Sequence, residues 1–443
     1  METRQRFSPK ALTLPKKEVL SGAFFWLGAF YFVYCARPED WVPGMSYLPL
    51  AKITSILALL ALAMSFGKMK LGARHIPREG NYLGLMIMWM FVASVTSPVW
   101  PSGSILRTLD FSKVWIAWVL TYLLVTTFGR LRRLLFIQAG SVAVVAAISV
   151  VKGRHTARLE GVLNGIYSNS NDLAFAIVLA LPFCLAFLLT AKSVLRKLAW
   201  AGVMLIMCAA LFLTASRAGF IDFVISGGVC LWYFGVKGKR PQLVAGAMLV
   251  LSFLFIGFGG LLKARFMAIV GSQVDPTVQS AYGSYEERKF LYYKSMEAIS
   301  HHPLLGVGPH CFANYSGIWK VVHNAYLQIG AEAGIPALIL YLLFLGSAFK
   351  NLRVLRKRPD LDVHTTLFVG ALQSSLIGFV VGALFAPSGY NFFPYFAVAQ
   401  TSVLMAIVRE TDASPAAPEL VKEPRQLGIY ARNQRTKPIP SLH

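Results

Sequence analysis

Long apolar stretches dominate the chain and recur from residue 19 to residue 408. A run of about 17–25 apolar residues lets an α-helix cross the hydrocarbon core of a membrane while it satisfies its own backbone hydrogen bonds. Such stretches lie at 19–36, 48–66, 82–97, 111–128, 131–151, 173–191, 198–214, 219–235, 242–262, 323–348, 364–386 and 391–408. The pattern therefore predicts an all-α polytopic membrane protein with about twelve transmembrane helices.

The overall composition agrees with this pattern. Of the 443 residues, 56% are hydrophobic and 14% charged, and the mean hydropathy is +0.57. Soluble proteins carry about 25% charged residues, so a soluble enzyme is excluded, as is disorder over most of the chain. No small-residue cleavage site follows the first apolar run, which is therefore predicted to be a membrane helix rather than a signal peptide. The five cysteines form no CxxC, and we interpret them as small helix residues.

The net charge of +23, from 43 basic and 20 acidic residues, would suggest a nucleic-acid partner on a soluble protein. Here the basic residues follow the topology. If the N-terminus is cytoplasmic, 29 of the 43 fall in segments predicted to face the cytoplasm, namely 1–18, 67–81, 129–133, 192–197, 236–241, 349–363 and 409–443. Positive charge concentrates on the cytoplasmic side of membrane proteins. The excess charge therefore predicts an orientation with both termini cytoplasmic, and no nucleic-acid partner.

The runs divide the chain into five segments. We predict a cytoplasmic N-terminal segment at 1–18, nine transmembrane helices over 19–262, a large periplasmic loop at 263–322, three more helices over 323–408 and a disordered cytoplasmic tail at 409–443. The loop contains a polar helical stretch and then the glycine- and proline-rich sequence HHPLLGVGPHCF. Loops of this length with their own secondary structure are usually functional.

Basic residues that break the topological rule are the candidates for chemistry. Arg217 lies in LTASRAGF between two apolar runs on the outer side, and Arg288 lies in YEERKF of the large loop. The planar guanidinium never deprotonates and suits a diphosphate. The alternatives are that Arg217 reaches lipid headgroups, and that Arg288 pairs with a neighbouring glutamate on a surface helix.

Other polar residues of the outer side are weaker candidates. His323 is the first residue of the run at 323–348. A neutral imidazole at this depth can accept a proton from a hydroxyl. The alternative is that it forms a hydrogen bond with a carbonyl or a lipid phosphate at the start of the helix. In the first outer loop, Lys152, Arg154 and Arg158 are candidates for steering an anionic substrate. Asn169 and Asn171 either cap the following helix or bind a sugar or phosphate.

Motifs for metal and nucleotide chemistry are lacking. The outer segments contain no DxD, and the chain has neither GxxxxGK[ST] nor GxSxG. His301, His302, His310 and Cys311 invite a metal interpretation, but no acidic ligand is near them in sequence and the glycines favour a turn. We predict no metal site and no cofactor.

The ordered set of motifs resembles one family, the O-antigen ligase and polymerase superfamily of bacterial inner-membrane C-type glycosyltransferases. The resemblance rests on SNSNDLA, TASRAG, the ER pair of the loop helix, HPLLGVGPHCF and HNAYLQIGAEAGIPAL, in that order. The N-terminal stretch YFVYCARPEDWVPGMSYLPLAK further resembles exosortase-associated O-glycosylation ligases. The likeness covers about residues 20–408, and the combination is far more specific than any single motif.

The resemblance implies a glycan donor on undecaprenyl diphosphate and transfer at the periplasmic face of the inner membrane. The acceptor it implies is a hydroxyl of lipid A–core or of another glycan, and the reaction is inverting and metal-independent. The family's functional residues carry over to Arg217, Arg288 and His323. Two arginines would stabilise the departing lipid diphosphate, and His323 would deprotonate or orient the attacking hydroxyl.

Two further interpretations stay open. Within the enzyme class, the chain is a polymerase of the same lipid-linked glycan, or a ligase to protein or exopolysaccharide. Outside that class, it is a transporter of lipid-linked glycans, which would place ionisable groups inside the spans. Such groups are sparse, with Lys52, Asp222 and Glu332 as examples. The acceptor itself has no motif that the sequence identifies.

Overall fold

The computed structural model describes residues 20–64, 75–155, 158–161, 167, 169–267 and 276–413, almost entirely as helices. In chain order the elements are α1 (Ser21–Ala36), α2 (Pro38–Trp41), α3 (Leu50–Ala63), α4 (Arg78–Val95), α5 (Pro101–Leu124), α6 (Phe128–Lys152), β1 (Arg154–His155), β2 (Leu159–Glu160), α7 (Ser170–Thr190), α8 (Val194–Leu213), α9 (Arg217–Cys230) continued by a π-helical turn (Leu231–Val236), α10 (Pro241–Met267), α11 (Pro276–His301), α12 (Phe312–Tyr315), α13 (Ala325–Arg356), α14 (Val363–Gly382) and α15 (Phe392–Ala413).

The predicted fold class is confirmed. In the described ranges, β-structure is limited to the antiparallel ribbon β1–β2, which pairs two residues from each strand. The predicted N-terminal segment 1–18 and residues 414–443 of the predicted tail lie outside the described residues.

The number of membrane spans differs from the prediction. Each of the twelve predicted ranges coincides with a helix. Among the described residues, however, only eight helices are long and apolar enough to cross a membrane, namely α6, α7, α8, α9 with its π turn, α10, α13, α14 and α15. Helices α1 and α3 are apolar but have only 16 and 14 residues. The count of twelve is therefore not confirmed, whereas a multi-pass membrane protein is.

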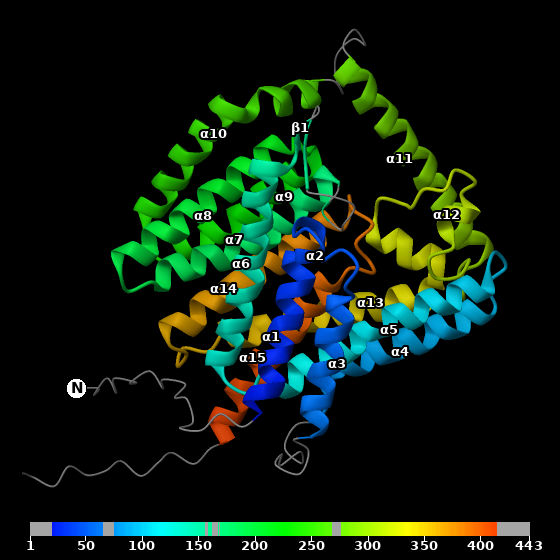
Figure 1. The fold of residues 1–443 in the computed structure, drawn as a ribbon, viewed down its shortest axis with the longest axis horizontal. Coiled ribbons are helices and arrows are strands. Elements are labelled where there is room, and N and C mark those ends of the chain that lie inside the picture. The colour runs from blue at the N-terminus through cyan, green and yellow to red at the C-terminus, as the bar shows by residue number, and fades with distance from the viewer. Residues whose placement is uncertain are drawn as a thin grey trace, which may run out of the picture.

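Helix α7 is the centre of the bundle (Figure 1). It packs against α6, α8, α9 and α14, and 89% of its apolar window is buried. A helix enclosed in this way needs no polar stripe, and α7 is apolar around its circumference. In contrast, only 22% of the α8 window and 11% of the α10 window are buried. These two helices form an edge of the bundle that faces its surroundings.

We call one end of the bundle the ribbon end, because it carries the β1–β2 ribbon together with residues 214–217 and residues 302–324. In the view of Figure 1, α10 and α11 run like the two arms of an inverted V, and α10 lies along α8. Arg358 lies in the connection between α13 and α14, where it bonds Asp360 and also Asp412 at the end of α15. These ion pairs join the α13–α14 connection to the end of α15, opposite the ribbon end.

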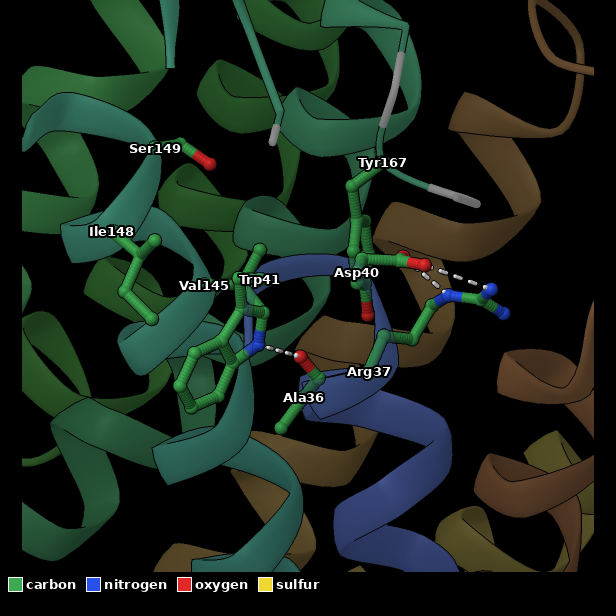
Figure 2. Close-up of a pocket in the computed structure, with 8 residues that line it drawn as sticks. All are labelled: Ala36, Arg37, Asp40, Trp41, Val145, Ile148, Ser149 and Tyr167. Carbon is green, nitrogen blue, oxygen red and sulfur yellow. Dashed lines mark hydrogen bonds and ion pairs between the residues drawn. The ribbon is translucent and has the colours of Figure 1, made fainter. Parts of the chain in front are cut away.

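The sequence ARPEDW forms a compact cap on the end of α1 (Figure 2). Arg37 has a left-handed backbone and donates from Nε to Asp40 Oδ2 at 2.6 Å. The Trp41 indole turns back toward α6 and donates to the Ala36 carbonyl at 2.7 Å, and Tyr167 Oη donates to the Cys35 carbonyl at 2.8 Å. The cavity between these groups measures about 10 Å³, room for about one water molecule.

Candidate functional site

Arg217 is presented by a tight turn between α8 and α9. The turn passes through Ala215, whose φ of +47° is left-handed and unusual for a residue with a side chain. Ser216 then caps α9, because its Oγ accepts a hydrogen bond from the Gly219 amide at 3.1 Å. Arg217 is thus the first helical residue. A helix N-terminus already favours anions, and the guanidinium adds a full positive charge there.

Arg288 approaches the same place from the other side, on α11. Its side chain is half-buried, and its Nε is buried with no hydrogen-bond partner among the described residues. Burial lowers the pKa of Arg288, and the nearby positive charge of Arg217 lowers it further. A buried donor that lacks a protein acceptor is uncommon in folded proteins. Two like charges and an unused donor together form a surface that is complementary to an anion.

His323 completes the group. It immediately precedes α13, whose start is fixed because Asn324 Oδ1 accepts from the amides of Tyr326 and Leu327 at 3.0 Å each. Burial lowers the pKa of His323 to about 4, and the positive charge of Arg288 contributes to this shift. His323 is therefore neutral at pH 7, the protonation state that a proton acceptor needs.

Arg288 is the member that links the three. Its electrostatic interactions reach Arg217 on one side and His323 on the other. The three residues come from α9, α11 and the start of α13, far apart in sequence. Their association places two guanidinium groups and a neutral imidazole together at the ribbon end. Such a group can hold a polyanion and accept a proton beside it.

The start of α13 is also joined to α14. The Ala325 amide donates to the Ala383 carbonyl at 2.8 Å, and Tyr326 Oη donates to the Val380 carbonyl at 2.8 Å. These bonds connect the residues after His323 to the end of a central helix. The imidazole is therefore carried by rigid elements rather than by a free loop.

The glycine- and proline-rich segment of the loop is docked into a break in α13. Gly334 has a φ of +80°, and a Cβ at this position would lie 2.0 Å from the Leu304 carbonyl oxygen. Only glycine allows this approach. The Ile335 amide, which follows the break, donates to the Pro303 carbonyl at 2.8 Å. The segment that links α11 to α12 is thus fixed against a membrane helix.

Glu332 is a structural member of this region that sequence reasoning did not assign. Its carboxylate is buried and accepts from the amides of His310 at 2.9 Å and Phe312 at 3.4 Å. The sequence signal was an acidic residue inside an apolar run nine positions after His323. In sequence, this acidic residue suggests only the transporter alternative. Its observed partners are backbone groups of the docked loop.

The other candidate residues lie as follows. Lys152 ends α6 and is exposed, while Arg154 lies in β1, paired in register with Glu160. Asn169 caps α7 by accepting from the Asn171 amide at 2.9 Å. Arg158 and Asn171 bond to each other and to the turn before Arg217.

Metal-binding geometry is lacking in the part of the chain that the structure describes. No three histidine, cysteine or acidic side chains there come together as ligands. His310 stacks on Tyr390 with ring centroids 4.2 Å apart, and Cys311 is buried and unpaired. The other four cysteines are also buried and free.

A large apolar groove of about 1090 Å³ lies between α7, α8, α9 and α10. Phe212 and Phe220, on either side of the Arg217 turn, line one end of it, and Leu231 and Gln242 line the other. From Phe220 to Leu231 along α9 this distance corresponds to roughly 16 Å of helix rise. Leu205, Val224, Met248 and Ile256 of its lining are large exposed apolar side chains. An extended apolar chain in this groove would have its head beside Arg217.

Comparison with known proteins supplies the family. A comparison with curated proteins found no match. Residues 202–342 match the family model of the O-antigen ligases. This range contains Arg217, Arg288 and His323, and it also contains most of the groove. Over residues 202–342, the match confirms the resemblance to the O-antigen ligase superfamily that the motifs indicated.

Proposed function

We propose that the protein transfers a glycan from undecaprenyl diphosphate to a hydroxyl of lipid A–core at the periplasmic face of the inner membrane. The family match supports an enzyme that acts on a lipid-linked glycan in a membrane. The observation that carries the proposal is the convergence of Arg217, Arg288 and His323 at the head of the apolar groove. The two arginines are complementary to a diphosphate, and the apolar groove is complementary to a polyprenyl chain.

In the proposed reaction the acceptor oxygen attacks the anomeric carbon as the bond to the diphosphate breaks. Arg217 and Arg288 stabilise the charge that develops on the leaving diphosphate. His323 accepts the proton of the attacking hydroxyl, so that the new glycosidic bond forms without a free alkoxide. The leaving group departs as an anion and needs no general acid. A single displacement inverts the configuration at the anomeric carbon.

The acceptor is tested by the state of the lipid-linked glycan in cells that lack the protein. A ligase is expected to leave full-length polymer on the carrier lipid and lipid A–core without glycan. Loss of a polymerase would instead leave single repeat units, and loss of a transporter would leave the glycan inaccessible from the periplasm. Purified protein with labelled lipid-linked donor and lipid A–core should yield the glycosylated acceptor without any energy source. Failure of this transfer with active protein would contradict the proposal.

The pH dependence of transfer is expected to reflect the environment of His323. Because the pKa of His323 is lowered to about 4, the imidazole stays unprotonated until the pH falls through that value. Activity should therefore persist at pH 5–6, where an ordinary histidine with a pKa near 6.5 would be largely protonated. Replacing Arg288 by glutamine removes a nearby positive charge, which should raise the pKa of His323.

The measurement is kcat/KM against pH for the wild type and for Arg288→Gln. The acid limb of the variant should lie at higher pH than that of the wild type, although its maximum is lower. A matched variant, Lys289→Gln, changes the charge of the next and exposed residue on α11 and should keep the wild-type limb. Identical limbs in all three proteins would refute the role of Arg288 in setting the state of His323.

A further inference from the structure

The sequence suggested that Arg158 meets the substrate, but its contacts indicate another role. Its Nε donates to the Thr214 carbonyl at 2.8 Å, and its Nη2 donates to Asn171 Oδ1 at 2.9 Å. Thr214 directly follows α8, so its carbonyl is at a helix end where intrahelical partners run out. One planar guanidinium thus joins the ribbon, the start of α7 and the turn between α8 and α9.

Asn171 extends this contact to the residue beside Arg217. Its Oδ1 accepts a second hydrogen bond, from Ser216 Oγ at 2.8 Å. The same Ser216 oxygen accepts from the Gly219 amide and so caps α9. A chain of hydrogen bonds therefore runs from Arg158 through Asn171 and Ser216 into the first turn of the helix that begins with Arg217.

The turn itself requires such support. Ala215 has a left-handed backbone, which costs free energy for a residue with a Cβ and persists where the surroundings impose it. Thr214, Ala215 and Ser216 are all nearly fully buried. Gly219 packs so closely on α7 that an added Cβ would lie 2.6 Å from Ala174 Cβ. The direction in which Arg217 leaves α9 is thus set by the contacts of this turn.

We propose that Arg158 and Asn171 are positioning residues, which hold the Thr214–Ser216 turn and thereby orient Arg217 toward the donor diphosphate. The inference rests on the proposed function for its kinetic consequences. The hydrogen-bond network itself does not depend on that function. An experiment can therefore contradict the positioning network and the proposed transfer reaction independently.

Arg158→Lys is the most informative variant. It keeps the positive charge, but a single ammonium group cannot replace the guanidinium, whose Nε and Nη2 donate to the Thr214 carbonyl and to Asn171 Oδ1 at the same time. Misplacing a charged group in an active site costs about a hundredfold in rate, so we expect kcat to fall about 10- to 100-fold with a smaller change in the donor KM. Lys289→Gln, which removes an exposed charge on α11, should leave both constants unchanged.

Asn171 provides the conservative rescue. Asn171→Asp retains the oxygen that accepts from Arg158 and Ser216 and should stay near wild-type activity. Asn171→Leu has a similar size without that oxygen, and it should lose activity as Arg158→Lys does. In an Arg217→Ala background, Arg158→Lys should cause no further loss of transfer activity, because the effects of substitutions that act through the same group are not additive.

Amide hydrogen exchange over residues 212–219 tests the network without any transfer reaction. The Ser216 and Gly219 amides donate to side chains of this turn, so Arg158→Lys should accelerate their exchange while Lys289→Gln does not. Wild-type exchange together with wild-type activity in Arg158→Lys would overturn the proposal, as would full recovery of activity by lysine. Faster exchange with an Arg217→Ala variant that is fully active would keep the positioning network and reject the proposed function.

Discussion

Replacing His323 by alanine is expected to reduce the transfer rate by about 10²- to 10⁴-fold, the usual contribution of a positioned general base. The acceptor hydroxyl would then have to lose its proton to water, which is not held in place to accept it. Donor binding should change little, because the proposed site holds the diphosphate through Arg217 and Arg288. The measurement is single-turnover transfer of labelled glycan, with donor affinity determined separately.

His301 supplies the matched control for this experiment. It ends α11 and is exposed at the same end of the bundle, so His301→Ala should keep the wild-type rate. Full activity of a folded His323→Ala protein would eliminate the proton-transfer step. A loss that appears only in the acceptor KM would show that His323 positions the acceptor without removing its proton.

Removing the two arginines is expected to have the largest effect of all. Each preorganised donor on a developing negative charge contributes about 10²- to 10³-fold in kcat. Arg217→Ala and Arg288→Ala should each lose this factor, with a partial recovery in the lysine variants, which keep the charge but not the fork. Because the two guanidinium groups act on one diphosphate, the double variant should lose less than the product of the two effects.

Lys289→Ala is the control for Arg288, since it removes an exposed charge from the adjacent position of the same helix. It should be indistinguishable from the wild type at physiological salt. Thermal unfolding in detergent should be unchanged in Arg288→Ala, because relief of the repulsion with Arg217 offsets lost contacts. If Arg217→Ala and Arg288→Ala both transferred glycan at the wild-type rate, the diphosphate would have to be stabilised elsewhere.

The positions of the helices could largely be predicted from hydropathy. The predicted run 173–191 and the observed α7 differ by three residues at the start, because Asn169 caps the helix and draws Ser170 into it. The break in α13 could not be placed in the same way. Pro336 marks an irregularity, but the left-handed residue is Gly334, and its conformation depends on the loop at Leu304. Such a contact between distant segments has no local signal in the sequence.

The candidate site was predictable to the extent that its motifs could be recognised. The motifs alone indicate Arg217, Arg288 and His323, and in the structure Arg288 interacts electrostatically with the other two. The role of Arg158 was not predictable. A basic residue in an outer loop looks the same in sequence whether its guanidinium meets a substrate or a carbonyl such as that of Thr214. Only the folded neighbourhood separates the two.

The apolar groove determines which measure of donor concentration controls its occupancy. Its walls include the sparsely buried helices α8 and α10, so in the proposed function the donor's lipid chain would reach it by diffusing sideways within the bilayer. The quantity that drives occupancy is then the number of donor molecules per area of membrane, not their molarity in the assay volume. In detergent the same quantity becomes a mole fraction in the micelle. A KM expressed in molar units would describe the detergent as much as the protein.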